Sequence, residues 1–250
     1  MLRVYLLGRV AVEGPQGVLE PHDFPGRQGR LAFVCLAASP RRVERHQLAE
    51  ILWGEDLPEA WDTDLNAVVS KLRRMFDRIG IRGTDTLESS YGCYELRFPD
   101  GTWIDLREAV NSLDHAEGAL ARSDAAAAWS AAAVASAILC RPLLPGEGGS
   151  WAEHKQRELQ ELQVRTYDTL AGAWLHTGNG RAAVSAARRA VELAPYRESA
   201  YARLMECHVA AGDRAEAVRV YAELRERLSD SLGISPAPEV EQIYLEALGR

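Results

Sequence analysis

The stretch Leu65-Asn66-Ala67-Val68-Val69-Ser70-Lys71-Leu72-Arg73-Arg74-Met75-Phe76-Asp77-Arg78-Ile79 decides how the first half of the chain can fold. Its evenly spaced apolar residues are Leu65, Val69, Leu72, Phe76 and Ile79, at intervals of four, three, four and three. This spacing predicts a helix over residues 62–79 whose narrow apolar stripe docks against other elements. Gly80 follows the stripe and is expected to end the helix.

The opposite side of this predicted helix is polar and basic. Its residues are Asn66, Ser70, Lys71, Arg73, Arg74 and Arg78. A helix fits the major groove of DNA, where Arg and Lys reach guanine edges, Asn pairs with adenine, and Ser, Lys and Arg contact phosphates. Charge spacing alone leaves a second interpretation open, a solvated basic face with ion pairs to acidic helices. Asp62 and Asp64 would repel phosphate, but they suit a capped helix N-terminus.

The surrounding elements predict a winged helix-turn-helix domain of the α+β class. Alternating apolar residues predict strands near 2–6, 10–12 and 18–20, and helices are expected over 28–38 and 45–52. After helix 62–79, two β runs at 86–88 and 93–98 flank a Ser/Gly turn and predict a hairpin. Three helices followed by a hairpin place the third helix in the major groove and the hairpin beside the DNA backbone.

The hairpin carries one further candidate for DNA binding. Arg97 lies at its end, where it is expected to meet a phosphate. Glu88 and Glu95 belong to the same hairpin and are unfavourable for that contact. The hairpin therefore offers both attraction and repulsion to DNA.

The second half of the chain is predicted to be helical throughout. The expected helices are 107–121, 124–139, 150–176, 180–194, 197–211, 213–230 and 236–248. Gly178-Asn179 and Gly212-Asp213 lie 34 residues apart, and 34 is the tetratricopeptide period. The sequence thus predicts two domains: a winged helix over 1–106 and an all-α tetratricopeptide-like domain over 107–250.

Composition and charge narrow the classes of function. The chain has 250 residues and a formal charge of −7, divided as −2 over residues 1–107 and −5 over 108–250. Neither half is basic, so DNA contact requires a local patch. The sequence lacks a phosphate-binding loop, a dinucleotide-binding glycine motif and a nucleophile elbow. We therefore expect no enzyme activity, no catalytic residue and no cofactor.

Metal binding, export and disulfide bonding are also unexpected. The six histidines form no ligand cluster, and the cysteines Cys35, Cys93, Cys140 and Cys207 lie far apart, as expected for buried free thiols. The chain has neither a secretory leader nor an apolar run long enough to span a membrane. A cytoplasmic protein without membrane contact is expected.

Several segments together resemble the Streptomyces antibiotic regulatory protein (SARP) family, whose members join a response-regulator-type winged helix to a bacterial transcriptional activator domain. The segments are 48–54 (LAEILWG), 65–74 (LNAVVSKLRR), 92–96 (GCYEL), 141–146 (RPLLPG), 150–151 (SW), 221–225 (YAELR) and 232–239 (LGISPAPE). The resemblance implies a transcriptional activator that binds direct repeats of double-stranded DNA near a promoter. It further implies two protomers side by side on DNA, engagement of the RNA polymerase holoenzyme and pathway-specific regulation, such as that of secondary metabolism.

The resemblance places DNA contacts on Asn66, Ser70, Lys71, Arg73 and Arg74. The sequence departs from the family at Ala67-Val68-Val69, where larger residues are common, and in its acidic hairpin. The net charge of −2 over residues 1–107, together with Glu88 and Asp64, keeps a second hypothesis open, a protein-interaction module whose winged helix has lost DNA binding. A third hypothesis is a sensor whose helical repeat binds a metabolite.

The helical half carries no assigned site. The aromatic residues Trp129, Trp151, Trp174, Tyr167, Tyr196 and Tyr201 could line a groove, although core packing is the more common role of large aromatics. No ATPase, forkhead-associated or sensor module follows in this sequence. Regulation is therefore expected to depend on abundance, on partners or on a ligand.

Overall fold

The computed structural model describes residues 1–249, which form two compact units. The first, here called the winged-helix unit, comprises Met1–Glu108 together with Arg141–Arg157. The second, the helical unit, comprises Ala109–Cys140 and the residues from Glu158 onward. The domain boundary after residue 106 stays a prediction, and the structure adds a later segment to the first unit. No helix among the described residues is long and apolar enough to cross a membrane.

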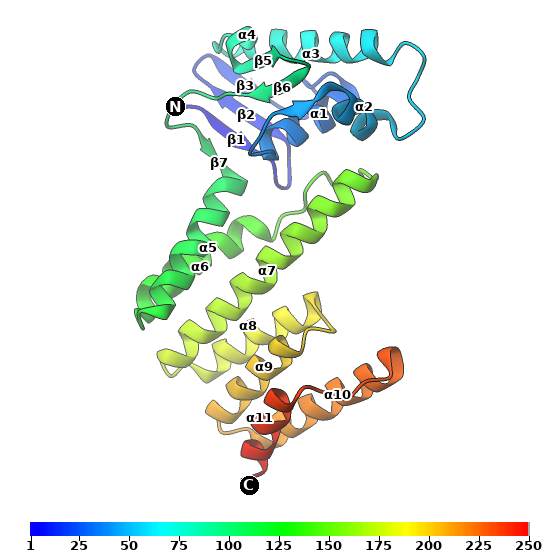
Figure 1. Ribbon diagram of the computed structural model, residues 1–250. Coiled ribbons are helices and arrows are strands. Elements are labelled where there is room, and N and C mark those ends of the chain that lie inside the picture. The colour runs from blue at the N-terminus through cyan, green and yellow to red at the C-terminus, as the bar shows by residue number, and fades with distance from the viewer. Residues whose placement is uncertain (250) are drawn as a thin grey trace. The chain divides into compact units, whose positions relative to one another are not determined.

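Two small sheets and four helices build the winged-helix unit (Figure 1). The strands are β1 (Arg3–Tyr5), β2 (Ala11–Gly14), β3 (Gly17–Leu19), β4 (Val43–Glu44), β5 (Leu87–Ser90), β6 (Cys93–Leu96) and β7 (Trp103–Ile104). The helices are α1 (Gly26–Ala38), α2 (Arg45–Trp53), α3 (Trp61–Arg78) and the short α4 (Gly83–Thr86). One sheet has the order β3-β2-β1-β7, with β7 parallel to β1, and the other has the order β4-β6-β5.

The apolar stripe of α3 is the centre of this unit's core. Leu65, Val69, Leu72, Phe76 and Ile79 are all buried, as the spacing predicts. Phe76 contacts Phe33 of α1 with ring centroids 6.0 Å apart, and Phe98, beyond β6, with centroids 6.3 Å apart. Because α1 and the segment after β6 both pack on this stripe, the rotation of α3 about its own axis is fixed.

Arg141–Arg157, here called the strap, belongs to the same unit, although two helices separate it in the chain from the rest of the unit. Leu143 forms a β-bridge with Leu7, and the Gly8 amide donates a 2.7 Å hydrogen bond to the Pro142 carbonyl. Leu143 and Leu144 are almost fully buried. Glu147 binds Arg27 and Arg30 of α1. The strap therefore supplies both apolar surface and hydrogen bonds to the winged-helix unit.

A buried carboxylate joins the end of β1 to the helix that follows β7. Asp105 is fully buried and accepts hydrogen bonds from the amides of Leu6, Leu7 and Leu106. Burial raises the pKa of Asp105, and the three amides act in the opposite direction. A carboxylate at a helix N-terminus satisfies amides that would otherwise lack partners.

The remaining elements are helices: α5 (Asp105–Ala121), α6 (Ala125–Leu139), α7 (Ser150–His176), α8 (Gly180–Leu193), α9 (Glu198–Ala210), α10 (Arg214–Leu232) and α11 (Pro238–Leu248). In Figure 1, α8 to α11 follow one another as a stack of helices.

The 34-residue spacing found in the sequence corresponds to a repeated helix cap in the structure. Asn179 and Asp213 cap α8 and α10 by accepting a hydrogen bond from the amide three residues on. The glycine before each cap has a positive φ, 75° at Gly178 and 81° at Gly212, which favours glycine.

The predicted helices agree closely with those observed, and the fold class is confirmed. Three details differ. Helix α3 begins at Trp61 without a side-chain cap, so Asp62 and Asp64 lie in its first turn instead of capping it. Cys35 and Cys207 are buried, but the prediction of a buried thiol is wrong for Cys93, which is partly exposed, and for Cys140, which is exposed. Short α4, β4 and β7 were not predicted, because two to four residues carry too little periodicity to be recognised.

Replacing Leu72 tests the packing of the α3 stripe. Leu72→Ala should lower the free energy of unfolding by about 2–5 kcal/mol, because it leaves a cavity at a fully buried position. Lys71→Ala, at the exposed neighbouring position, should change it by less than about 0.5 kcal/mol. Urea unfolding followed by circular dichroism measures both. Equal stability of the two variants would contradict the assignment of the stripe to the core.

A buried histidine should make the helical unit sensitive to acid. His208 is 6% exposed, and burial followed by the neighbouring charge of Arg188 lowers its pKa below 6.5. At pH values below about 6.5, the ordinary pKa of histidine, the unfolded chain binds a proton more readily than the folded chain does. The free energy of unfolding therefore falls as the pH decreases below this value, and this loss is absent at higher pH. We expect a lower melting temperature at pH 5.5 than at pH 7.5, a difference that His208→Gln reduces. His115→Gln, at an exposed position, should leave the difference unchanged.

Candidate nucleic-acid interface

The outward face of α3 is the candidate surface for DNA. Asn66, Ser70, Lys71 and Arg74 are exposed, on the side of α3 opposite its apolar stripe. Within the part of the chain that the structure describes, no hydrogen bond or ion pair engages the side chains of Ser70, Lys71 or Arg74. Two cations and a hydroxyl are thus available to an external partner, and each belongs to a residue type that contacts bases or phosphates.

Arg45, the first residue of α2, holds the start of this face in place. Its guanidinium donates hydrogen bonds to Asn66 Oδ1 at 3.1 Å, to the Asp62 carboxylate and to the Tyr94 hydroxyl. It also lies 5.4 Å from the centre of the Tyr94 ring. The hydrogen bond from Arg45 to the Asp62 carboxylate is the main cause that raises the pKa of Arg45. One side chain therefore connects α2, α3 and β6, and it orients the Asn66 amide.

Two of the predicted contact residues already have partners within the unit. Arg73 Nε donates a 3.0 Å hydrogen bond to the Leu87 carbonyl of β5, and Arg78 Nη2 lies 2.8 Å from the Asp23 carboxylate. The Glu20 amide and then Arg78 lower the pKa of Asp23. The roles of Arg73 and Arg78 in DNA binding stay predictions. Their observed contacts fasten α3 to the hairpin and to the segment before α1.

Carboxylates of the hairpin β5–β6, here called the wing, hold two neighbouring arginines in an ion-pair network. Arg97 lies 2.9 Å from both the Glu88 and the Glu95 carboxylates, and Arg42 lies 2.8 Å from Glu95. Arg97 and then Arg42 lower the pKa of Glu95, while Glu95 and then Glu88 raise the pKa of Arg97. The proposed phosphate contact of Arg97 stays a prediction, and it competes with two carboxylates.

Sequence reasoning missed two residues of this region. Arg45 lies 21 residues before Asn66, and nothing in the local pattern pairs them. Tyr91 at the tip of the wing is 96% exposed, and it stands in the turn that the sequence identifies only as Ser/Gly-rich. The Tyr-Gly pair at 91–92, between two β runs, was the available signal.

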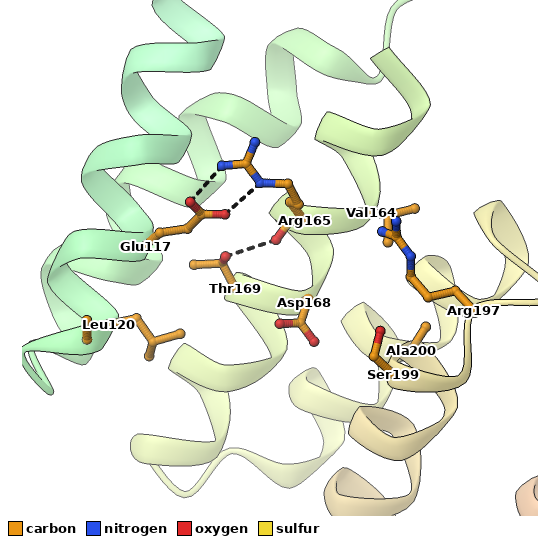
Figure 2. Close-up of a pocket in the computed structure, with 10 residues that line it drawn as sticks. Glu117, Leu120, Val164, Arg165, Asp168, Thr169, Arg197, Ser199 and Ala200 are labelled. Carbon is orange, nitrogen blue, oxygen red and sulfur yellow. Dashed lines mark hydrogen bonds and ion pairs between the residues drawn. The ribbon is translucent and has the colours of Figure 1, made fainter. Parts of the chain in front are cut away.

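The helical unit has a surface cavity of about 420 Å³ between α5, α7 and the start of α9 (Figure 2). Arg165 of α7 binds Glu117 of α5 through two hydrogen bonds of 2.9 and 2.7 Å. Asp168, which also lines the cavity, accepts a 3.0 Å hydrogen bond from Arg203. These charged side chains of the cavity wall are therefore already paired within the helical unit.

The aromatic residues singled out in the helical half do not line this cavity. Tyr201 is fully buried, whereas Trp129 and Tyr196 are exposed and the others are partly buried. Trp129 and Trp174 contact each other with ring centroids 5.5 Å apart. Among the described residues, no group of three or more His, Cys, Asp or Glu side chains is placed to hold a metal ion.

A winged-helix unit with a β-hairpin wing, joined to tetratricopeptide-like helices, defines the class of winged helix-turn-helix proteins with a helical repeat. The family profile of the bacterial transcriptional activator domain matches residues 104–248. The chain belongs to this family, and the resemblance to SARP regulators is confirmed.

Known relatives are transcriptional regulators. The regulatory protein AfsR of Streptomyces griseus is 28% identical over 222 residues, which cover 89% of this chain and 22% of AfsR. The transcriptional regulatory protein MoaR1 of Mycobacterium tuberculosis is 24% identical over 93% of this chain and 75% of MoaR1. The chain therefore spans less than a quarter of the AfsR length.

A solved structure shares the complete fold. EmbR of Mycobacterium tuberculosis, in complex with a low-affinity phosphopeptide, superimposes with a TM-score of 0.89 at 23% identity. The match covers 99% of this chain and 65% of the EmbR chain. The arrangement of a winged helix followed by a tetratricopeptide-like helical domain is thus shared with EmbR.

Replacing Arg45 tests whether one side chain organises the interface. Arg45→Ala should lower the free energy of unfolding by about 1–3 kcal/mol, because charge-assisted hydrogen bonds are lost and the Tyr94 hydroxyl loses a partner. Arg45→Lys should recover only part of this, since an ammonium lacks the planar fork of donors. Arg74→Ala is the matched control on an exposed arginine. If Arg45→Ala unfolds at the same urea concentration as Arg74→Ala, Arg45 has no organising role.

Proposed function

We propose that the chain is a sequence-specific DNA-binding transcriptional activator that reads DNA through α3. The observation that carries the proposal is the face of Ser70, Lys71 and Arg74, whose side chains are exposed and unengaged within the described chain. Membership of a family of transcriptional regulators supports it. In an acidic chain of net charge −7, a local unpaired basic patch is the feature that DNA binding requires.

The residues of this face are suited to different kinds of contact with DNA. Asn66 and Arg74 carry side chains that can pair with adenine and guanine edges, respectively. Ser70 and Lys71 can bind phosphates and so set the register of α3 in the major groove. Arg45 acts indirectly, by orienting the Asn66 amide. Arg73, Arg78 and Arg97 each have at least one N–H group bound within the unit, so they have fewer free donors for DNA than Arg74 has.

Two protomers bind side by side on direct repeats near a promoter, and the complex recruits the RNA polymerase holoenzyme. The chain is neither an enzyme nor a cofactor-dependent protein, and it acts in the cytoplasm, associated with the nucleoid. Its regulation is pathway-specific, as in secondary metabolism. The helical repeat offers surfaces for partner proteins, since stacked helix pairs present extended binding faces.

A second candidate function is a protein-interaction module that has lost DNA binding. The observation that favours it is the pairing of Arg78 and Arg97 with carboxylates, which leaves fewer cations for phosphate. The two candidates differ in one measurable property, which is binding to a duplex.

Selection from a randomised duplex library at about 0.15 M salt tests the proposal. We expect enrichment of a direct repeat, lost in the variant Lys71→Ala plus Arg74→Ala. Because Lys71 contacts a phosphate whereas Arg74 reads a base edge, the salt slope of the remaining binding should fall by about one unit. Arg181→Ala plus Arg225→Ala removes two exposed arginines of the helical unit and is the charge-matched control.

The outcome separates the two candidates. Enrichment that survives in the control and disappears in the α3 variant supports the activator. Absence of enrichment even at about 0.05 M salt, where phosphate attraction is far stronger, contradicts it and favours the interaction module. Circular dichroism of every variant excludes unfolding as the cause.

A further inference from the structure

The tip of the wing exposes a large aromatic side chain. Tyr91 is 96% exposed, and its side chain has no hydrogen bond or ring contact within the described residues. It stands between Ser90 and Gly92 in the two-residue turn that joins β5 to β6, where Ser90 pairs with Cys93. The flanking residues are small, so the tip can approach another surface closely.

The backbone at this position disfavours tyrosine. Tyr91 has a φ of 51° and Gly92 a φ of 71°, and two positive values are what a type I′ hairpin turn requires. Asn, Asp and Gly adopt this conformation readily, whereas other residues are strained there by roughly 1 kcal/mol. A strained and exposed aromatic side chain contributes nothing to the stability of the hairpin. Such residues are concentrated at functional sites.

The arginines near the wing are less available than Tyr91 for contact with an external surface. Arg97 lies 2.9 Å from both the Glu88 and the Glu95 carboxylates, and Arg42 lies 2.8 Å from the Glu95 carboxylate alone. Two positive and two negative charges cancel, so this network has no net attraction for phosphate. Releasing Arg97 to DNA would leave Glu88 unpaired beside a polyanion.

We propose that the wing contacts DNA through Tyr91 and not through Arg97. The inference rests on the proposed function and names the part of the wing that meets the duplex. The ring packs against a deoxyribose of the backbone beside the groove that α3 reads, and the phenol hydroxyl donates to a phosphate oxygen. This contact is largely apolar, so it adds affinity with little dependence on salt.

Tyr91→Asn is the decisive variant, because Asn-Gly is the preferred type I′ pair and the hairpin should fold at least as well as before. We expect it to weaken binding to the selected operator by about tenfold, the equivalent of one contact of about 1.4 kcal/mol. The slope of log affinity against log salt should stay the same. Tyr91→Phe, which keeps the ring, should retain most of the affinity.

A charge-balanced variant tests the other half of the proposal. Glu88→Gln plus Arg97→Gln removes one charge of each sign, and its affinity should stay within about twofold of the unmodified protein. The proposal is overturned if Tyr91→Asn, folded by circular dichroism, binds the operator as tightly as the unmodified chain. It is also overturned if the charge-balanced variant loses affinity while Tyr91→Asn keeps it. Failure of the unmodified chain to bind any duplex would instead defeat the proposed function.

Discussion

The winged-helix unit depends on one constraint, the packing of the apolar stripe of α3 against α1 and the aromatic residues around Phe33 and Phe98. A helix has only one rotation that buries such a stripe, so the same packing determines which side chains point away. The exposed residues of α3 are therefore fixed by the core. A change in the stripe that rotated α3 by a fraction of a turn would alter every potential contact on its outer face together.

Ion pairs between arginines and carboxylates neutralise much of the charge on the winged-helix unit. Many of the arginines in the winged-helix unit lie beside a carboxylate, including Arg9, Arg27, Arg42, Arg45, Arg78 and Arg97. Exposed ion pairs of this kind contribute little to stability, but they remove charge from the long-range field. Lys71 and Arg74 then stand out against a neutralised surface. A protein can in this way carry a negative total charge and still present a positive site.

Local sequence predicted the elements that have a strong period or a defined turn chemistry. The α3 stripe, the wing hairpin and the caps Asn179 and Asp213 are recognisable because each depends on residues within a few positions of one another. The partners of the candidate site could not be predicted in the same way. Arg78 meets Asp23 across 55 positions and Glu147 meets Arg27 across 120, and such pairs depend on the finished fold. In the sequence, nothing distinguishes Arg74 from Arg73, Arg78 and Arg97. The tertiary contacts reveal that the latter three are bound to other groups of the winged-helix unit.

The strap has a consequence for how the protein is made. The hydrophobic residues Leu143 and Leu144, which complete the winged-helix core, are synthesised well after β7 and only after α5 and α6. Since domains usually fold in order as the chain leaves the ribosome, the winged helix must wait, incompletely packed, for a later segment. Suppose that two relatives exchanged complete domains by a single genetic crossover after residue 106. The winged-helix core would then be separated from the strap that completes it. Selection should therefore favour inheriting the first 157 residues as one piece.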